Sequence, residues 1–277
     1  MKSFYRFTAP LFSLSFLVSL SLLVISSEAH ARGMGSVIEE NAMVPNGQGI
    51  SSPSFWGAIS GQNPAGIVDN FGFKLQGAGA SFDDSTKNLR ESGGIFLGNG
   101  LLAAGAEYTT FNSDPYPQGE NQINFGMGGR LQAVHTSVGI SGHSVSNGGG
   151  STYDAGMIID LTPQLHLGGM IPDFTHGLHT VGGGFTFMAD QTVDFVIDAG
   201  YQLQDRNGIV KPGISLHTNL LQVTAAYGFR FRGVADEVLV TTKFTAGLGI
   251  KLMEKIFIEY EYRVLPEHVL GLTLRFN

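Results

Sequence analysis

The chain has 277 residues, a formal net charge of −7, no cysteine and 39 glycines, and 14% of its residues are charged. An acidic balance disfavours nucleic-acid binding, and the lack of cysteine excludes both a disulfide framework and a lipid-modified N-terminal cysteine. So little charge with so much glycine is unusual for a soluble secreted enzyme, and no run of about 20 apolar residues beyond position 31 predicts a membrane helix.

The first 31 residues are predicted to be a secretory signal peptide. Lys2 and Arg6 precede an apolar run over 11–25, and Ala29-His30-Ala31 has the small-x-small form of a cleavage site. A transmembrane anchor is the alternative. Serines within the apolar run and the well-formed cleavage site favour a signal that is removed after Ala31.

Residues 32–70 are predicted to form a periplasmic or luminal hatch rather than wall. Residues 41–68 contain no charged side chain and no alternating pattern, and their prolines and glycines interrupt any long element. Phe55, Trp56 and Ile59 give this segment apolar surface to bury.

From residue 71 onward, the pattern predicts fourteen strands joined by connections that alternate between long and short. The expected strands are 71–82, 92–98, 101–111, 122–131, 133–145, 153–162, 165–173, 178–189, 193–204, 211–219, 220–232, 238–253, 256–265 and 267–276. The second is short, so twelve is the alternative count. Short turns such as Asn99-Gly100 alternating with longer loops, and an even number of strands, are typical of an up-and-down outer-membrane β-barrel. The fold class is therefore predicted to be all-β, with residues 71–277 as the barrel.

Each strand is predicted to turn an apolar face to lipid and a polar face to the lumen, because side chains alternate between the two faces of a strand. In the last forty residues the even positions are almost all apolar and the odd ones mostly polar or glycine. Elsewhere the predicted inward residues are Lys74, Gln76, Glu107, Asn124, Arg130, His135, His143, Asp154, Asp160, His166, Asp194, Asp198, Arg230 and Arg232. Aromatic residues at the outer strand ends, among them Tyr108, Tyr153, Tyr201, Tyr227 and Tyr260, predict an interfacial girdle.

Two stretches carry a resemblance to a known family. Phe55 to Ile67, with Asn63-Pro64-Ala65-Gly66, resembles the N-terminal segment of FadL-like outer-membrane transport proteins and their PorV-type relatives. Leu265 to Phe276 is similar to the closing hairpin of the PorV-type branch, although Asn277 follows the terminal aromatic. The resemblance implies a fourteen-stranded barrel with a hatch in its lumen that conducts hydrophobic molecules. It also implies a barrel-assembly signal at Leu270, Leu272, Leu274 and Phe276.

Charged positions on the predicted inner face are candidates for a polar lining of the lumen. They are Glu107, Arg130, Arg230, Arg232, Lys243, Lys251, Glu259, Glu261 and Arg263. One interpretation is a set of interior salt bridges that stiffens the barrel. The other is a constriction that selects solutes or anchors the hatch.

Catalytic and metal chemistry have weaker support in the sequence. In a regular strand, Ser144 and Ser146 would face away from His143, which disfavours a lipid hydrolase. His176 and His179 lack obvious partner ligands, so neither a metal nor a cofactor is expected.

The leading function is passive transport of a hydrophobic or amphipathic small molecule in the outer membrane. Phe55, Trp56, Ile59, Asn63, Pro64, Ala65 and Gly66 would form the gate. The expected partners are outer-membrane lipids, the barrel-assembly machinery and a hydrophobic ligand, with no nucleic acid. One alternative is a structural or secretion-accessory barrel that binds a partner protein, and a second is a lipid hydrolase that uses His143.

Overall fold

The computed structural model describes residues 63–69, 71–82, 89–112, 120–145, 151–178, 180–189, 192–203, 207–234, 237–238, 241–252, 255–263 and 267–276. A 3-10 helix, η1 (Pro64–Asp69), comes before the strands, and two more follow, η2 (Gln132–Val134) and η3 (Phe174–His176). The strands are β1 (Phe71–Phe82), β2 (Leu89–Asn99), β3 (Leu102–Asn112), β4 (Glu120–Leu131), β5 (Thr136–Val145), β6 (Ser151–Thr162), β7 (Leu165–Ile171), β8 (Thr180–Met188), β9 (Val193–Gln202), β10 (Asn207–His217), β11 (Leu221–Val234), β12 (Glu237–Val238), β13 (Thr241–Leu252), β14 (Ile256–Arg263) and β15 (Glu267–Phe276).

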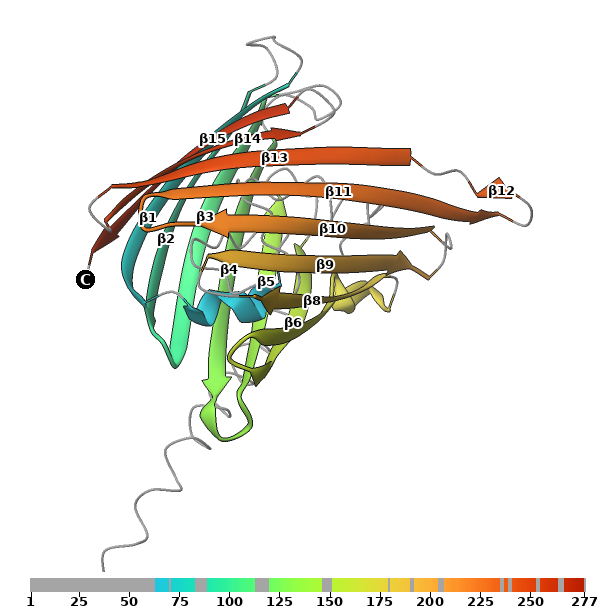
Figure 1. The fold of residues 1–277 in the computed structure, drawn as a ribbon, viewed down its shortest axis with the longest axis horizontal. Coiled ribbons are helices and arrows are strands. Elements are labelled where there is room, and N and C mark those ends of the chain that lie inside the picture. The colour runs from blue at the N-terminus through green and yellow to red at the C-terminus, as the bar shows by residue number, and fades with distance from the viewer. Residues whose placement is uncertain are drawn as a thin grey trace, which may run out of the picture.

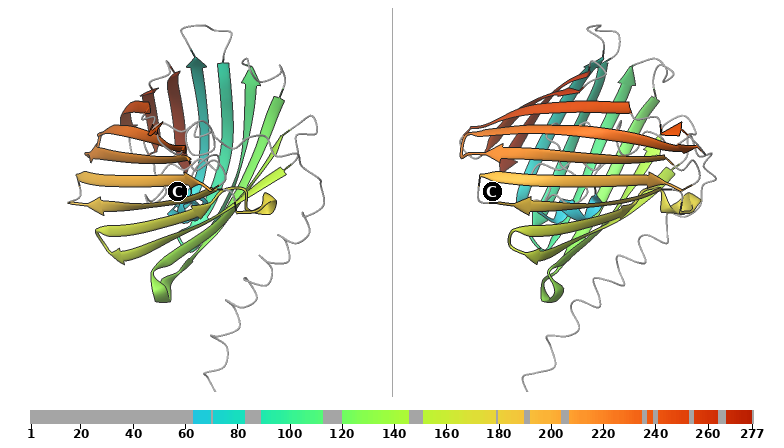
Figure 2. Two further views of the ribbon diagram at one scale, coloured as in Figure 1. Left: turned by 90° about the vertical axis from the view of Figure 1, so that its right-hand side faces the viewer. Right: turned by 45° about the vertical axis from the view of Figure 1, so that its right-hand side comes forward.

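Fourteen of these strands close into an antiparallel barrel (Figures 1 and 2). Chain neighbours pair with one another throughout, β10 pairs with β11, and β1 pairs with β15 to close the wall. The two-residue strand β12 pairs with the end of β11. The predicted fold class is confirmed, and the count is the expected fourteen rather than twelve.

The two faces of the wall carry the predicted side chains. Inward-pointing Lys74, Glu107, Asn124 and Glu259 are each at most 5% exposed, although they are polar. The outer face presents large apolar side chains from every wall strand, such as Leu97, which is 64% exposed. A closed barrel satisfies its own backbone, and an apolar exterior of this kind is what a bilayer covers. Across the described residues, no helix has the length and apolar character that a membrane crossing requires.

Several strand bounds differ from the sequence prediction. Strand β10 covers Asn207–His217 rather than 211–219. Strand β2 is longer than expected, with 11 residues. Strand β5 begins three residues later than expected, because residues 132–134 form η2 and His135 follows in the left-handed conformation, with φ +48°. His135 therefore lies exposed in a turn, and its predicted inward position is wrong.

The short turns satisfy their own backbone groups. A side-chain oxygen of Asn99 accepts two backbone N–H bonds in the β2–β3 turn, both at 2.9 Å, and Thr162 and Thr218 do the same in the β6–β7 and β10–β11 turns. Turn carbonyls also accept bonds from the strand that follows the hairpin. The Arg130 N–H donates to the Leu101 carbonyl at 2.8 Å, and the Asp160 N–H donates to the His135 carbonyl at 2.8 Å. The hydrogen-bond ladder thus continues across the turns.

Candidate functional site: a luminal segment on a glycine seat

Residues 63–69 lie inside the barrel (Figure 1). They come directly before β1, so they sit near the end of the barrel that carries the short turns. The segment contacts β2 to β6, and β4 and β5 more than the others. Asn63 to Val68 are all buried, and Asp69 is half-buried. We call residues 63–69 the luminal segment.

Three glycines on adjacent strands form the surface on which the luminal segment lies. Gly128 of β4 pairs with Gly139 of β5, and Gly139 pairs with Gly156 of β6, so the three form one row across the wall. A Cβ added at Gly139 would overlap the Pro64 backbone, and one at Gly156 would overlap the Asn63 side chain. A Cβ at Gly128 would lie 2.8 Å from Val68. We call this row the glycine seat, because only a residue without a side chain lets the segment approach so closely.

The side chain of Asn63 binds the segment to two strands. Its amide nitrogen donates to the Met157 carbonyl of β6 at 3.0 Å and to the Gly169 carbonyl of β7 at 3.2 Å. Its amide oxygen accepts the Ala65 N–H at 3.0 Å, and its backbone carbonyl accepts the Gly66 N–H at 3.0 Å. One asparagine therefore begins the 3-10 turn and holds it to the wall.

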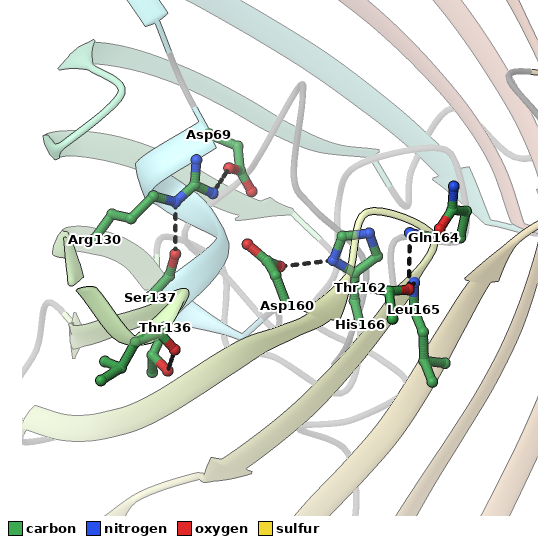
Figure 3. Close-up of polar contacts among 10 residues, drawn as sticks. Asp69, Arg130, Thr136, Ser137, Asp160, Thr162, Gln164, Leu165 and His166 are labelled. Carbon is green, nitrogen blue, oxygen red and sulfur yellow. Dashed lines mark hydrogen bonds and ion pairs between the residues drawn. The ribbon is translucent and has the colours of Figure 1, made fainter. Parts of the chain in front are cut away.

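An ion pair holds the other end of the segment. Asp69 pairs with Arg130 of β4, and Arg130 Nε donates to Ser137 Oγ of β5 at 3.2 Å (Figure 3). Burial raises the pKa of the Asp69 carboxyl above its usual value, and the Arg130 guanidinium opposes part of this rise. Nearby, His166 Nδ1 lies 2.6 Å from Asp160 Oδ1, whereas His166 Nε2 is buried without a hydrogen-bond partner among the described residues.

Apolar contacts complete the docking. Ile67 and Val68 form one buried cluster with Phe96 of β2 and Ala103 of β3. Val68 is fully buried, and Phe96 is 2% exposed. Burying these side chains stabilises the docked segment by the hydrophobic effect, about 1.5–3 kcal/mol for each large side chain that leaves water.

The predicted gate residues divide into two groups. Asn63, Pro64, Ala65 and Gly66 lie in the luminal segment, while Phe55, Trp56 and Ile59 fall outside the described residues. Ile67, Val68 and Asp69 also belong to the docked segment, and the sequence analysis did not single them out. The sequence did hold a signal for these three residues. The uncharged stretch continues to Val68 and ends at Asp69, so the predicted gate could have been extended from Gly66 to Asp69.

The predicted lumen lining is partly described. Glu107 and Glu259 are buried on the inner face, and Arg130 and Lys251 are half-buried. Glu259 pairs with Gly249 and Lys251 with Phe257, so Glu259 and Lys251 are diagonal rather than directly opposite. The side chains of Arg230, Arg232, Lys243, Glu261 and Arg263 lie outside the described part of the structure. The residues of the expected assembly signal, Leu270, Leu272, Leu274 and Phe276, all face outward.

A second polar cluster lies around His143, on the side of the glycine seat away from the short turns. Its Nδ1 is 2.8 Å from Asn124 Oδ1, and its Nε2 is 2.9 Å from Asp154 Oδ2. Asp154 Oδ1 accepts the Asp173 N–H at 2.9 Å, which ties the β7–β8 connection to the wall. Both nitrogens of His143 are thus occupied by fixed groups of the wall.

This cluster does not have the geometry of a hydrolase site. Ser144 follows His143 on the strand and so points to the opposite face, and Ser146 lies outside the described residues. Ser141 shares the face of His143, but its Oγ is 3.5 Å from the same Nε2 that Asp154 occupies. A general base needs that nitrogen to take the proton of the serine. Among the described side chains, no group of three or more metal-ligating residues gathers.

Comparisons with known proteins identify the fold. No protein-family model matches the chain, and no curated protein matches it. Among solved structures, it is similar to a TodX monoaromatic hydrocarbon channel with the deltaS2S3 mutation, at 10% identity and a TM-score of 0.56, covering 77% of this chain and 93% of that one. It is also similar to the P. putida toluene transporter TodX (10% identity, TM-score 0.52, 78% and 93% covered) and to the Acinetobacter baumannii outer membrane protein Omp33 (10%, 0.51, 74% and 98%). These three similar structures are therefore outer-membrane β-barrel proteins. Because their sequence identity to this chain is only 10%, they establish its fold alone.

Proposed function

We propose that this protein is an outer-membrane channel for passive transport of hydrophobic or amphipathic small molecules, gated by the N-terminal hatch. The observation that carries the proposal is the docking of residues 63–69 on the glycine seat inside the barrel. A segment held by a few hydrogen bonds, one ion pair and a small apolar cluster blocks part of the lumen and can be released.

The apolar outer face of the barrel wall supports a location in the outer membrane. The apolar outer face needs lipid, and the predicted signal peptide, cleaved after Ala31, would export the chain. Insertion would require the barrel-assembly machinery, which would read the outward residues of β15 up to Phe276. In the exported protein, residues 32–70 would form the hatch and residues 71–277 the barrel.

The inner face supports an amphipathic cargo. Buried apolar residues on it, such as Ile158, Met170 and Val196, alternate along the wall with polar ones, such as Asp154 and Asp198. Two of the similar structures bear the names of a monoaromatic hydrocarbon channel and a toluene transporter. A lumen with both kinds of surface suits a small molecule that has an apolar body and a polar group.

Uptake into proteoliposomes tests the proposal. Protein lacking residues 41–66 should take up a small aromatic solute faster than the intact protein, because the gate is absent. Gly139→Ala should also speed uptake by displacing the segment. Gly183→Ala is the matched control, because the nearest atom to its added Cβ is a carbonyl oxygen 3.7 Å away.

Failure of every form to transport would contradict the proposal. The structural or partner-binding alternative would then be the better account. The charged and polar side chains buried in the lumen, such as Lys74 and Glu107, would in that case stiffen a barrel that conducts nothing.

A further inference from the structure

One arc of the short-turn rim is uncharged and carries exposed apolar side chains. It comprises the β2–β3, β4–β5 and β6–β7 turns, which are consecutive around the barrel. Leu101 and Val134 lie in the turns themselves and are 41% and 59% exposed. Leu102, Leu131 and Leu161 flank the turns on the outer face and are also exposed. We call these five residues the apolar rim.

The turns of this arc contain no lysine, arginine, aspartate or glutamate. Residues 100–101, 132–135 and 163–164 consist of glycine, aliphatic, proline, glutamine and histidine residues. The β8–β9 and β13–β14 turns differ, because their sequences contain Asp190, Glu254 and Lys255. The β10–β11 turn, which lies between those two, is uncharged and carries Leu220, which is 63% exposed. Charged residues thus occur in two of the short turns outside the arc and in none of the three turns within it.

Backbone N–H and C=O groups of these turns have hydrogen-bond partners within the protein, so they do not depend on water. Backbone groups at membrane depth must be satisfied within the protein. In the β2–β3 turn the Leu101 and Leu102 N–H groups donate to Asn99 Oδ1, and the Leu101 carbonyl accepts from Arg130. In the β6–β7 turn, Thr162 Oγ1 accepts two N–H bonds, and the Gln164 carbonyl accepts from Met188 at 2.8 Å.

The height of the wall gives an independent argument. Tyr108 is exposed near the outer end of β3, where an aromatic girdle marks one membrane interface. Leu101 is seven residues from it along the chain, which corresponds to about 18 Å of height for a tilted strand. The apolar band of such barrels is about 25 Å tall. If Tyr108 lies at the outer interface, Leu101 lies within the apolar layer.

We propose that the apolar rim is embedded among the acyl chains of the periplasmic leaflet, so that this side of the barrel mouth opens at the level of lipid rather than in the periplasm. The inference rests on the proposed function for its membrane setting and deepens it. The occupant is phospholipid, because the apolar rim continues the apolar outer wall without a break. The glycine seat lies on the same strands, β4 to β6, so cargo released from the gate would meet the inner leaflet first.

Single cysteines can report the surroundings of each turn, because the chain has none of its own. Leu101→Cys and Val134→Cys would probe the apolar rim, and Ile95→Cys, on the exposed outer wall, serves as the lipid-facing control. Thr192→Cys and Lys255→Cys are the matched controls, exposed in the two charged turns. Each variant is labelled with an environment-sensitive fluorophore and reconstituted in phosphatidylcholine vesicles after its folding has been checked by heat-modifiable gel mobility.

Two quenchers distinguish a label that lies in lipid from a label that lies in water. Spin-labelled phosphatidylcholine should quench the labels at 101, 134 and 95 at least twofold more than aqueous iodide does. The order should reverse at 192 and 255. Iodide quenching at 101 and 134 equal to that at 192 overturns the proposal.

A protein partner would give a different result. If labels at 101 and 134 are open to iodide in pure lipid vesicles but shielded from both quenchers in native outer-membrane vesicles, a protein covers the apolar rim and the lipid assignment is wrong. Solute uptake measured on the same vesicles separates the two proposals. Lipid quenching without uptake would retain the embedded rim and reject transport.

Discussion

The two halves of the wall use luminal glycine in different ways. On the β4–β6 side, Gly128, Gly139 and Gly156 are covered by the luminal segment, which is not part of the wall. On the opposite side, the wall covers its own glycines, since Phe257 of β14 lies over Gly249 of β13. The glycines of the seat are thus covered by a segment outside the wall, whereas Gly249 is covered by a side chain of the neighbouring strand. The same residue type therefore makes room for the proposed gate in one place and for local packing in the other.

The largest effect is expected from filling the seat. Gly139→Val would place a branched side chain where the Pro64 backbone lies, which the segment cannot accommodate without leaving. With Val68→Cys as a buried reporter, the rate of thiol labelling should rise at least 100-fold. Gly249→Val should lower the thermal midpoint by crowding Phe257 but leave the labelling rate unchanged. Equal labelling in both variants would remove the distinction between the halves.

A smaller effect is expected from removing the Asn63 amide. Asn63→Ala deletes its hydrogen bonds to Met157 and Gly169 and should cost the docked state about 2 kcal/mol, because two wall carbonyls lose a donor. Labelling at the Val68→Cys reporter should rise about 30-fold. Gln222→Ala removes an amide from the opposite wall, where Gln222 Nε2 bonds Ser215 Oγ at 3.4 Å. A comparable rise in that control would show that the reporter follows general loosening of the barrel.

The ion pair should matter less. Arg130→Gln removes the charge that faces Asp69, but the Arg130 side chain is 31% exposed, so we expect a loss of about 1 kcal/mol. Labelling should rise about fivefold, and addition of Asp69→Asn should raise it little further, because the two residues act as one pair. Additive effects of the two substitutions would argue against a direct pair. Lys251→Gln, on the inner face of β13, should leave the labelling rate unchanged.

The smallest effect on docking is expected at His143. His143→Gln disrupts the cluster with Asn124 and Asp154, which lies on the side of the glycine seat away from the short turns. Thermal stability should fall, because buried polar groups lose their partners. The labelling rate should remain within twofold of the reporter alone. A large increase would mean that this cluster and the luminal segment are coupled.

The faces and approximate bounds of the strands could be predicted because alternation is a local property of the chain. Strands such as β1 and β15 begin and end where the pattern predicts. The error at His135 arose because a short 3-10 turn changes the phase of the pattern without a proline or glycine to mark it. Inward apolar residues such as Phe257 were missed because a polar inner face was assumed throughout.

The glycine seat could not be predicted from the sequence, because it depends on register. Gly128, Gly139 and Gly156 form one row only when three strands pair as they do. Glycine carries no hydropathy signal that distinguishes the two faces. Likewise, Asp69 and Arg130 are 61 residues apart, and nothing local connects them. The candidate gate was visible as a motif, whereas its partners in the wall required the structure.

The glycine row also determines what a vacated seat would present. Without the luminal segment, Gly128, Gly139 and Gly156 would face the lumen with main chain alone. A passing molecule would then meet peptide groups already engaged in the strand ladder, with no side chain to bind or obstruct it there. Selection of cargo would therefore fall to the surrounding side chains, such as Ser137 and Ser141, and the cleared row would be a narrow band of bare main chain across three strands.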